Sequence, residues 1–202
     1  MSVLDLIFPK YCLECKKEGS YICQICIEKV ERVGWHRSDS FAIWRYEGVI
    51  RKAIIAFKYK YAKEVGRELA LYVAQNLITN WRNKNDYSLI AVPLFWHKYN
   101  LRGFNQSGEV GTIIAQKMKW EFLPNLVVKK KSTKPQVELK RDKRKFNLEG
   151  SFELGDERKG NLDGKNLIIF DDVYTTGSTL LEIEKILKST NPKSILKLTL
   201  AK

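Results

Sequence analysis

The sequence predicts an α/β protein with a mainly parallel sheet, helices on both faces of that sheet and a small cysteine-rich module in front. Two observations carry this expectation. Beyond residue 40, short apolar runs alternate with longer segments of helical periodicity, and all four cysteines fall between residues 12 and 26. Because parallel strands need a crossover connection, usually a helix, such alternation is typical of a parallel sheet.

The length of the chain allows one main core and an appendage. With 202 residues and 44% hydrophobic content, the chain can bury a full-sized α/β core and still supply a small second unit. We therefore expect a module at residues 1–35 and an α/β domain at residues 36–202.

The first half of the α/β domain contains two expected strands and three expected helices. Aromatic residues alternate with others over residues 41–46, as in a short strand, and a helix is expected over 51–57. An amphipathic helix is expected over 61–81, where apolar residues recur at Val65, Leu69, Tyr72, Val73 and Leu77. Residues 89–92 form a compact apolar strand ended by Pro93, and a second long helix begins near Asn105.

The second half repeats this pattern. Residues 126–128, 167–170 and 195–200 are short apolar runs that we expect to be strands. Leu180, Ile183 and Leu187 recur at helical spacing between the last two runs. The helix that they predict completes the alternation.

The four cysteines predict a metal site. Two C-x-x-C pairs, separated by seven residues, comprise Cys12, Cys15, Cys23 and Cys26. Two such turns present four thiolates to one ion, as a structural Zn²⁺ site requires. The free energy of metal binding, about 10 to 16 kcal/mol, can stabilise a segment that is too short to form a hydrophobic core of its own. A four-thiolate site has no open position for substrate, so we expect a structural or partner-contacting role. Two disulfides or a redox dithiol are the alternatives.

The charge of the chain favours polyanionic partners. Lys and Arg number 36 against 23 Asp and Glu, a formal net charge of +13. Nucleic acid and phosphorylated small molecules both fit this balance. The apolar residues 3–8 are broken by Asp5 and end at Pro9, unlike a secretory signal, and no stretch approaches the length of a membrane span. We expect a cytoplasmic protein without membrane insertion.

An acidic pair and a hydroxyl-rich turn follow the apolar run at residues 167–170. The pair is Asp171 and Asp172, and the turn consists of Thr175, Thr176, Gly177, Ser178 and Thr179. Thr179 and Glu182 are spaced as a capping box at the start of a helix. In open α/β sheets, ligands sit beyond the carboxyl ends of the strands.

A sugar phosphate suits both halves of this segment. Carboxylates accept hydrogen bonds from ribose hydroxyls, whereas hydroxyls and the N–H groups at a helix N-terminus favour a phosphate. A buried strand followed by a solvated turn and an ordinary helix cap is the alternative. The chain has neither G-x-x-x-x-G-K-[ST] nor G-x-G-x-x-G, which disfavours P-loop ATPases and kinases and dinucleotide binding.

Residues 167–179 resemble the thirteen-residue phosphoribosyl-pyrophosphate (PRPP) signature of type I phosphoribosyltransferases. The resemblance implies a type I phosphoribosyltransferase-like parallel sheet with flanking helices. It further implies that Asp171 and Asp172 hold the ribose hydroxyls, that the turn from Thr175 to Thr179 holds the 5′-phosphate, and that Mg²⁺ binds with the diphosphate of PRPP.

Three further segments narrow the resemblance: the paired C-x-x-C motifs, Arg102-Gly103-Phe104-Asn105-Gln106 and residues 136–147. Together they resemble the competence protein F (ComF) family over nearly the whole chain. The resemblance implies that the strand end at Val92-Pro93-Leu94 faces the pyrophosphate and that the Arg102 element follows it. We expect Pro93, Leu94 and Arg102 on the pyrophosphate side, because a guanidinium fork matches phosphate oxygens. A surface arginine, with Asn105 as an ordinary helix cap, is the alternative.

The most charged stretch is residues 129–145, with nine Lys or Arg and two acids for a net charge of +7. In phosphoribosyltransferases the equivalent region is a flap that closes over the diphosphate. The stretch also suits single-stranded DNA, as does a second cluster in which basic residues are interleaved with aromatic ones. That cluster comprises Arg51, Lys52, Phe57, Lys58, Tyr59, Lys60, Tyr61, Lys63 and Arg67. A solvated charge run and an ordinary amphipathic helix are the alternatives.

Three functions remain open at this point. The first is a PRPP- or ribose 5-phosphate-binding protein of the competence type, acting in DNA uptake on single-stranded DNA with other competence proteins. The second is an active phosphoribosyltransferase with an unidentified nitrogenous acceptor, and the third is a zinc-ribbon nucleic-acid module with an inert α/β domain. No catalytic residue is assigned, and His36 and His97 are expected to be structural or surface residues.

Overall fold

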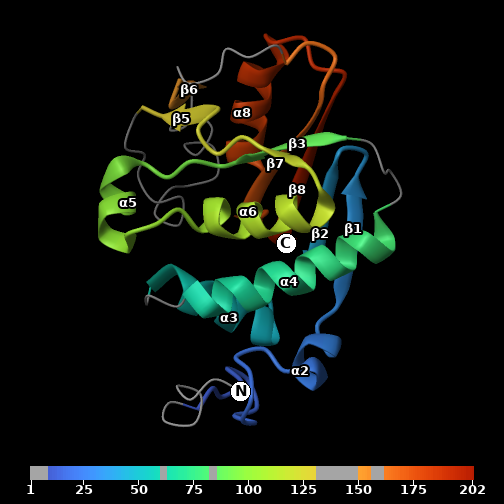
Figure 1. Ribbon diagram of the computed structural model, residues 1–202, viewed down its shortest axis with the longest axis vertical. Coiled ribbons are helices and arrows are strands. Elements are labelled where there is room, and N and C mark those ends of the chain that lie inside the picture. Colours follow the sequence, from blue (N-terminus) through green and yellow to red (C-terminus); the bar gives the residue numbers. More distant parts are fainter. Residues whose placement is uncertain (1–8, 60–62, 82–85, 131–149, 156–161) are drawn as a thin grey trace.

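The computed structural model describes residues 9–59, 63–81, 86–130, 150–155 and 162–202. Within them lies a six-stranded sheet of order β1-β2-β8-β7-β3-β4 (Figure 1). All neighbouring strands of this sheet run parallel except the β1–β2 hairpin, which confirms the predicted mainly parallel sheet. The strands are β1 (Arg32–Arg37), β2 (Ser40–Trp44), β3 (Tyr87–Ala91), β4 (Glu121–Phe122), β7 (Asn166–Val173) and β8 (Ser194–Ala201).

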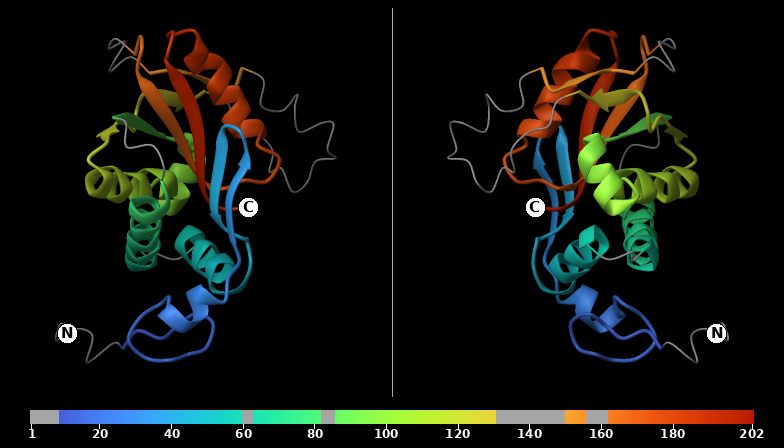
Figure 2. Two further views of the ribbon diagram at one scale, coloured as in Figure 1. Left: turned by 90° about the vertical axis from the view of Figure 1, so that its right-hand side faces the viewer. Right: turned by 90° about the vertical axis from the view of Figure 1, so that its left-hand side faces the viewer.

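Helices cover both faces of the sheet, as predicted. The described helices are α2 (Gln24–Glu28), α3 (Gly48–Tyr59), α4 (Lys63–Asn80), α5 (Trp96–Arg102), α6 (Gln106–Met118) and α8 (Ser178–Lys188). Helices α4 and α6 lie on one side of the sheet and α8 on the other (Figure 2). Among the described helices, none is long and apolar enough to span a membrane.

The central strand β7 explains this layering. Its residues alternate between the two cores: Ile168 and Phe170 pack with α4 and α6, and Leu167 and Ile169 pack with α8. All four are fully buried. A strand buried on both faces is continuously apolar, which is why this run was recognisable in the sequence.

Several details differ from the sequence-based expectations. The strand at Val127–Lys129 (β5) pairs antiparallel with Phe152–Leu154 (β6) in a separate two-stranded sheet, so it is not part of the main sheet. Strands β1, β4 and β6 and helices α2 and α5 were not expected. Helix α5 contains no buried residue, and therefore it has no apolar periodicity to find.

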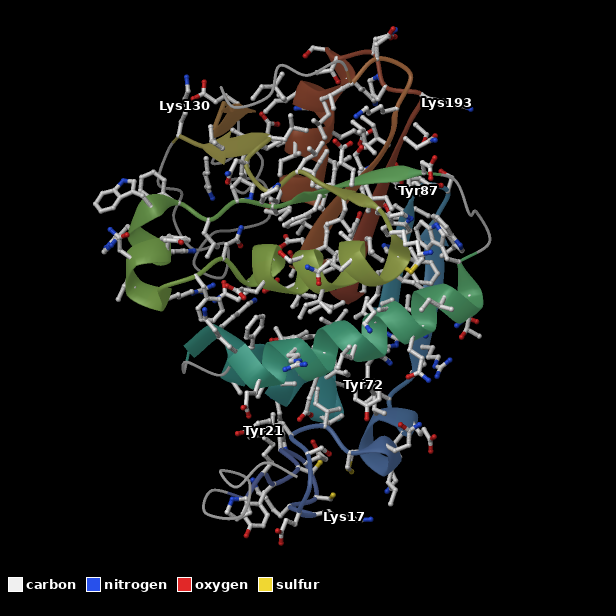
Figure 3. All side chains as sticks on the ribbon, in the orientation of Figure 1. Lys17, Tyr21, Tyr72, Tyr87, Lys130 and Lys193 are labelled. Carbon is white, nitrogen blue, oxygen red and sulfur yellow. The ribbon has the colours of Figure 1, made fainter. Side chains whose placement is uncertain are left out.

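The cysteine module packs directly on α3 and α4. The carboxylate of Glu68 accepts hydrogen bonds from the backbone N–H groups of Tyr21 and Ile22, and the Tyr72 hydroxyl donates to the Ile22 carbonyl. Figure 3 shows Tyr21 and Tyr72 on the two sides of this junction. Cys12, Ile22 and Cys26 belong to the same apolar cluster as residues of α3 and α4. The module and the domain therefore share one core.

A buried lysine fixes α8 to the sheet. Lys197 on β8 is 2% exposed, and its ammonium group pairs with Asp39 and with Glu184 of α8, the latter at 2.7 Å. Partial burial raises the pKa of both carboxyl groups, but their hydrogen bonds with Lys197 outweigh it. The pKa values of Asp39 and Glu184 therefore lie below their ordinary range.

We predict that Lys197→Met lowers the free energy of unfolding by about 3 kcal/mol at pH 7, because it leaves Asp39 without its cation and leaves Glu184 only the ammonium group of Lys188. The folded pKa values of Asp39 and Glu184 lie below the unfolded ones, so the stabilisation is full above the unfolded pKa near 4 and is lost as pH falls through the folded values. Urea unfolding between pH 7 and about pH 2 should show the difference shrinking. Lys193→Met, at an exposed lysine next to β8, is the control. A pH-independent difference would contradict this account.

Candidate functional site

The candidate site lies at the carboxyl edge of the sheet, where the chain leaves the neighbouring strands β3 and β7. The N–H of Val92, after β3, donates to Phe170 O at 2.9 Å, and the N–H of Tyr174, after β7, donates to Ala201 O at 2.8 Å. These bonds extend the parallel pairing beyond the strands. They bring the acidic pair, the turn into α8 and the segment after β3 to one place.

The acidic pair lies within β7 and not after it, because Asp171 is still in register with Thr199 of β8. Asp171 Oδ1 accepts hydrogen bonds from the Ser107 hydroxyl of α6 at 3.1 Å and from the Asp172 N–H at 2.9 Å. Removal of the group from water, and then repulsion from Asp172, raises the pKa of Asp171 to about 7. A hydrogen-bond donor or cation arriving here would favour the charged carboxylate.

Asp172 faces a lysine that we did not assign to this site from the sequence. The ammonium group of Lys58, in the last turn of α3, lies 2.6 Å from Asp172 Oδ2, and both side chains are mostly buried. Burial alone would lower the pKa of Lys58, but the attraction of Asp172 and Asp171 raises it above the ordinary value. Lys58 therefore stays charged and fixes the orientation of Asp172.

The hydroxyl-rich turn enters α8 through a glycine in the left-handed conformation. Gly177 is the N-cap residue, with φ of 75°, and a Cβ there would lie 2.4 Å from the Tyr174 hydroxyl. The hydroxyls of Thr176 and Ser178 are 2.8 Å apart. Since the first N–H groups of a helix have no intrahelical partner, hydroxyl and N–H donors converge here.

The predicted capping box is wrong. Because Gly177 already caps α8, Thr179 is the second residue of the helix and not its cap. The Glu182 carboxylate instead accepts hydrogen bonds from the Gly150 N–H and from Lys185. A glycine cap leaves the helix end open toward the turn, which a capping side chain would have covered.

The segment after β3 carries the expected pyrophosphate-side residues. Pro93 and Leu94 are partly buried, and Arg102 donates to Gln106 Oε1 at 2.9 Å. Asn105 is the N-cap residue of α6, but its side chain makes no capping bond and donates to Val92 O at 3.1 Å instead. Asn105 therefore occupies the N-cap position, as the alternative expected, but its side chain joins the two ends of the segment 92–105 and does not cap the helix.

Two further lysines lie within electrostatic range of this site: Lys129, which begins the charged stretch 129–145, and Lys98, which the sequence did not single out. Burial and the charge of Lys98 lower the pKa of Lys129 to about 8, while Asp171 opposes the shift. Burial and the charges of Arg102 and Lys58 lower the pKa of Lys98. The site therefore holds more positive charge than its two carboxylates balance.

The two basic stretches have different outcomes. Of residues 129–145, only 129 and 130 are described, so the flap expectation falls outside the described residues. In the second cluster, Phe57 is 2% exposed and packs on Phe104, and Lys58 is bound to Asp172. Phe57 and Lys58 are therefore not part of a DNA-binding surface, because Phe57 lies on the buried face of α3 and Lys58 forms an ion pair with Asp172.

The two histidines lie where expected. His36 packs edge to face on the Tyr174 ring, with the ring centres 4.7 Å apart, and His97 is exposed on α5.

The four cysteines form one cluster that could hold a metal. Their Sγ atoms all lie within 4.8 Å of one another, and all four are free thiols. Cys15 Sγ and Cys23 Sγ are 3.6 Å apart, close to the separation of about 3.8 Å expected when two sulfurs bind one tetrahedral Zn²⁺ at 2.3 Å. The cluster lies at the end of the molecule away from α8 (Figure 1). The donor set fits the predicted ion.

Comparison with known proteins identifies relatives over most of the chain. Competence protein F of Haemophilus influenzae is 31% identical over 93% of this chain and 82% of its own length. Competence protein ComFC of Streptococcus pneumoniae is 25% identical over 96% of this chain and 81% of its own length. The DNA utilization protein YhgH of Salmonella typhi is 27% identical over 82% of this chain and 70% of its own length.

The remaining comparisons add less. No protein-family model matches the chain. A solved hypoxanthine phosphoribosyltransferase of Staphylococcus aureus covers 68% of this chain and 63% of that chain at 12% identity, with a TM-score of 0.41. Because the Haemophilus protein is 31% identical over 93% of this chain, the chain belongs to the competence protein F family.

Proposed function

We propose that the protein binds PRPP or ribose 5-phosphate at Asp171, Asp172 and the turn from Thr175 to Thr179, and that it acts on single-stranded DNA during DNA uptake. One observation carries the first part. A pair of carboxylates and a helix N-terminus with a glycine cap meet at one edge of the sheet.

The two halves of the site suit the two halves of the ligand. Each carboxylate has about four acceptor positions, so the contacts of Asp171 with Ser107 and of Asp172 with Lys58 leave capacity for ribose hydroxyls. The turn supplies hydroxyl and N–H donors together with the positive end of the α8 dipole. Phosphate and ribose are therefore recognised by separate groups.

The cations near the acidic pair suit a diphosphate. Lys98 of α5 and Lys129 of β5 repel one another, and a polyanion between them would relieve that repulsion. We propose that Arg102 and the backbone at Pro93 and Leu94 complete this side. Bound Mg²⁺ would neutralise part of the diphosphate charge.

The same cations favour a second function, phosphoribosyl transfer to a nitrogenous acceptor. Positive charge beside the diphosphate would stabilise it as the leaving group when the anomeric carbon is attacked. Release of diphosphate from PRPP by the protein alone and with candidate amines or bases tests this function.

The DNA part of the proposal rests on the relatives and on charge. Two of the similar proteins are named for competence and one for DNA utilization. Residues 129–145 carry a net charge of +7, which suits the phosphates of a single strand. Other competence proteins are the expected partners.

We also propose that residues 1–35 are a module organised by Zn²⁺ and that residues 36–202 are the phosphoribosyltransferase-like domain. The four sulfurs gather within the distance that one ion requires. Four free thiols persist in a reducing compartment, so we place the protein in the cytoplasm.

We predict that Asp172→Ala weakens ribose 5-phosphate binding by about 1.5 to 3 kcal/mol but leaves inorganic phosphate binding nearly intact, because it removes the ribose contact and the Lys58 ion pair but does not change the turn that binds phosphate. Asp163→Ala, at an exposed aspartate before β7, is the control. The measurement is calorimetric titration of the wild type and both variants with ribose 5-phosphate and with inorganic phosphate. Equal losses for ribose 5-phosphate and phosphate would show that Asp172 does not contact the sugar.

We predict that Gly177→Val abolishes binding of both ligands. A β-branched residue is strained at φ of 75°, and its Cβ would meet the Tyr174 hydroxyl. Gly164→Val is a matched control, since Gly164 has φ of 69° but no atom within 4 Å of an added Cβ. If both variants lose binding equally, backbone strain and not the phosphate turn explains the effect.

We predict that the purified protein contains one Zn²⁺ and that Cys12→Ser with Cys26→Ser removes it. Because the module shares the core of α3 and α4, metal loss should lower the melting temperature as well. Glu68→Gln, which weakens docking of the module but leaves all four thiols, should keep the metal. Metal analysis that finds no Zn²⁺ in protein prepared without chelator would refute the assignment.

We predict that Lys129→Ala with Lys130→Ala flattens the salt dependence of single-stranded DNA binding. Two lost phosphate contacts reduce the log–log slope by about 1.4, at about 0.7 per contact. Lys117→Ala with Lys193→Ala is the control, at exposed lysines elsewhere; Figure 3 shows Lys130 and Lys193 on opposite sides. An unchanged slope in the first variant would place the DNA on another surface.

A further inference from the structure

Helix α5 is held in place at its C-terminal end by the residues that follow it. Its C-cap Gly103 has φ of 77° and donates its N–H to Tyr99 O at 2.7 Å. Beyond it, Phe104 is buried against Phe57 of α3, and Asn105 bonds back to Val92. None of the residues of α5 is buried, and the helix lies at the left edge of the molecule in Figure 1.

The exposed surface of this helix is unusually apolar. Trp96 is 64% exposed, Tyr99 48% and Leu101 74%. Trp96 also neighbours the rings of Phe95 and His97, with ring centres 5.7 and 5.6 Å away. Because exposing clustered large apolar side chains to water is unfavourable, such a patch indicates a binding partner.

The charge around the patch indicates what that partner is. Helix α5 carries Lys98 and Arg102 at i and i+4 and no acidic residue, and Lys98 lies within electrostatic range of Lys129 on β5. Lys58 is paired with Asp172, Lys130 with Glu153, and the ammonium group of Lys129 lies 5.2 Å from the centre of the Phe152 ring, whereas Lys98 is exposed on α5 and is repelled by Arg102 and Lys58. Aromatic rings among such cations suit a partner that has both flat bases and phosphates.

We propose that α5, together with Lys129, is the base-stacking surface for single-stranded DNA. Trp96 and Tyr99, three residues apart and thus neighbours on one face of the helix, stack on bases, while Lys98 and Lys129 bind phosphates. This inference rests on the proposed function, in which the protein binds single-stranded DNA, and it names the residues that contact the bases.

Other partners fit the surface less well. A duplex hides its bases in the stack, so the two rings would have nothing to pack against. A second copy of the chain in a two-fold contact would bring Lys98 and Arg102 toward their own counterparts, which like-charge repulsion opposes. A single strand uses both the rings and the cations.

The test is binding of a labelled oligothymidylate of about 16 nucleotides, followed by fluorescence anisotropy over a range of salt. Trp96→Ala and Tyr99→Ala should each weaken binding by about 5- to 150-fold without changing the salt slope, because stacking releases no counterions. Lys98→Gln should instead reduce the slope by about 0.7. Ile78→Ala, which removes an equally exposed apolar side chain from α4, should bind as the wild type does.

A second readout reports the stacking directly. Tryptophan fluorescence of the wild type should fall when the oligonucleotide saturates it. Trp96→Phe should bind within a few-fold of the wild type, since a ring remains, yet lose most of that fall. Because the side chains at 96 and 99 are exposed, all variants should melt at the wild-type temperature.

The outcomes separate this inference from the proposed function. If the wild type binds no single-stranded DNA, the DNA part of the proposed function is wrong and this inference with it. If the wild type binds but the Trp96 and Tyr99 variants bind equally well, only this inference is overturned. It is also overturned if those variants keep DNA affinity but lose self-association in sedimentation, or binding to vesicles of anionic lipid.

Discussion

The structure depends on the in-register parallel pairing of β7 with β3 on one side and β8 on the other. This pairing buries Ile168 and Ile169 on opposite faces, and it continues to Asp171, opposite Thr199. The polar end of an otherwise apolar strand is thereby held rigidly at the sheet edge. Everything else in the candidate site is placed relative to that edge: the turn into α8 directly after it, the segment after β3 beside it, and α3 and α6 through Lys58 and Ser107.

The arrangement of charged groups at this edge is electrostatically unfavourable when no ligand is bound. Asp171 is partly buried beside a second carboxylate, and Lys98 and Lys129 repel each other nearby. Groups with perturbed pKa values cluster at functional sites, because a bound ligand can supply the opposite charges and hydrogen bonds that these groups lack in the free protein. Helix α3 links the site to the cysteine module through two lysines. Lys58 forms an ion pair with Asp172, and Lys52 forms an ion pair with Glu14 of the module. One helix therefore contacts both the module and the site.

The sequence predicted the layered sheet and the position of the acids and hydroxyls at the sheet edge, because both are local patterns: Leu167 to Phe170 is continuously apolar, and the acids and hydroxyls follow it directly. It did not predict contacts between distant segments. Lys58 was grouped with a surface cluster because its neighbours are basic, and only the packing of α3 shows that it faces Asp172. Helix α5 was missed because it has no buried face, and its sequence therefore shows no apolar residues at helical spacing. The predicted capping box was wrong because Gly177, two residues before Thr179, is the N-cap residue of α8.

The most direct test of the central claim is calorimetric titration of the wild-type protein with PRPP in the presence of Mg²⁺, repeated with single-stranded DNA present. The account predicts saturable binding of one PRPP per chain without DNA, and weaker binding when DNA is present, because Lys98 and Lys129 are assigned to the phosphates of both ligands. It also predicts that ribose 5-phosphate competes for the same site, because the sugar and the 5′-phosphate are recognised by Asp171, Asp172 and the turn from Thr175 to Thr179. Absence of binding of both ligands at millimolar concentration would contradict the account.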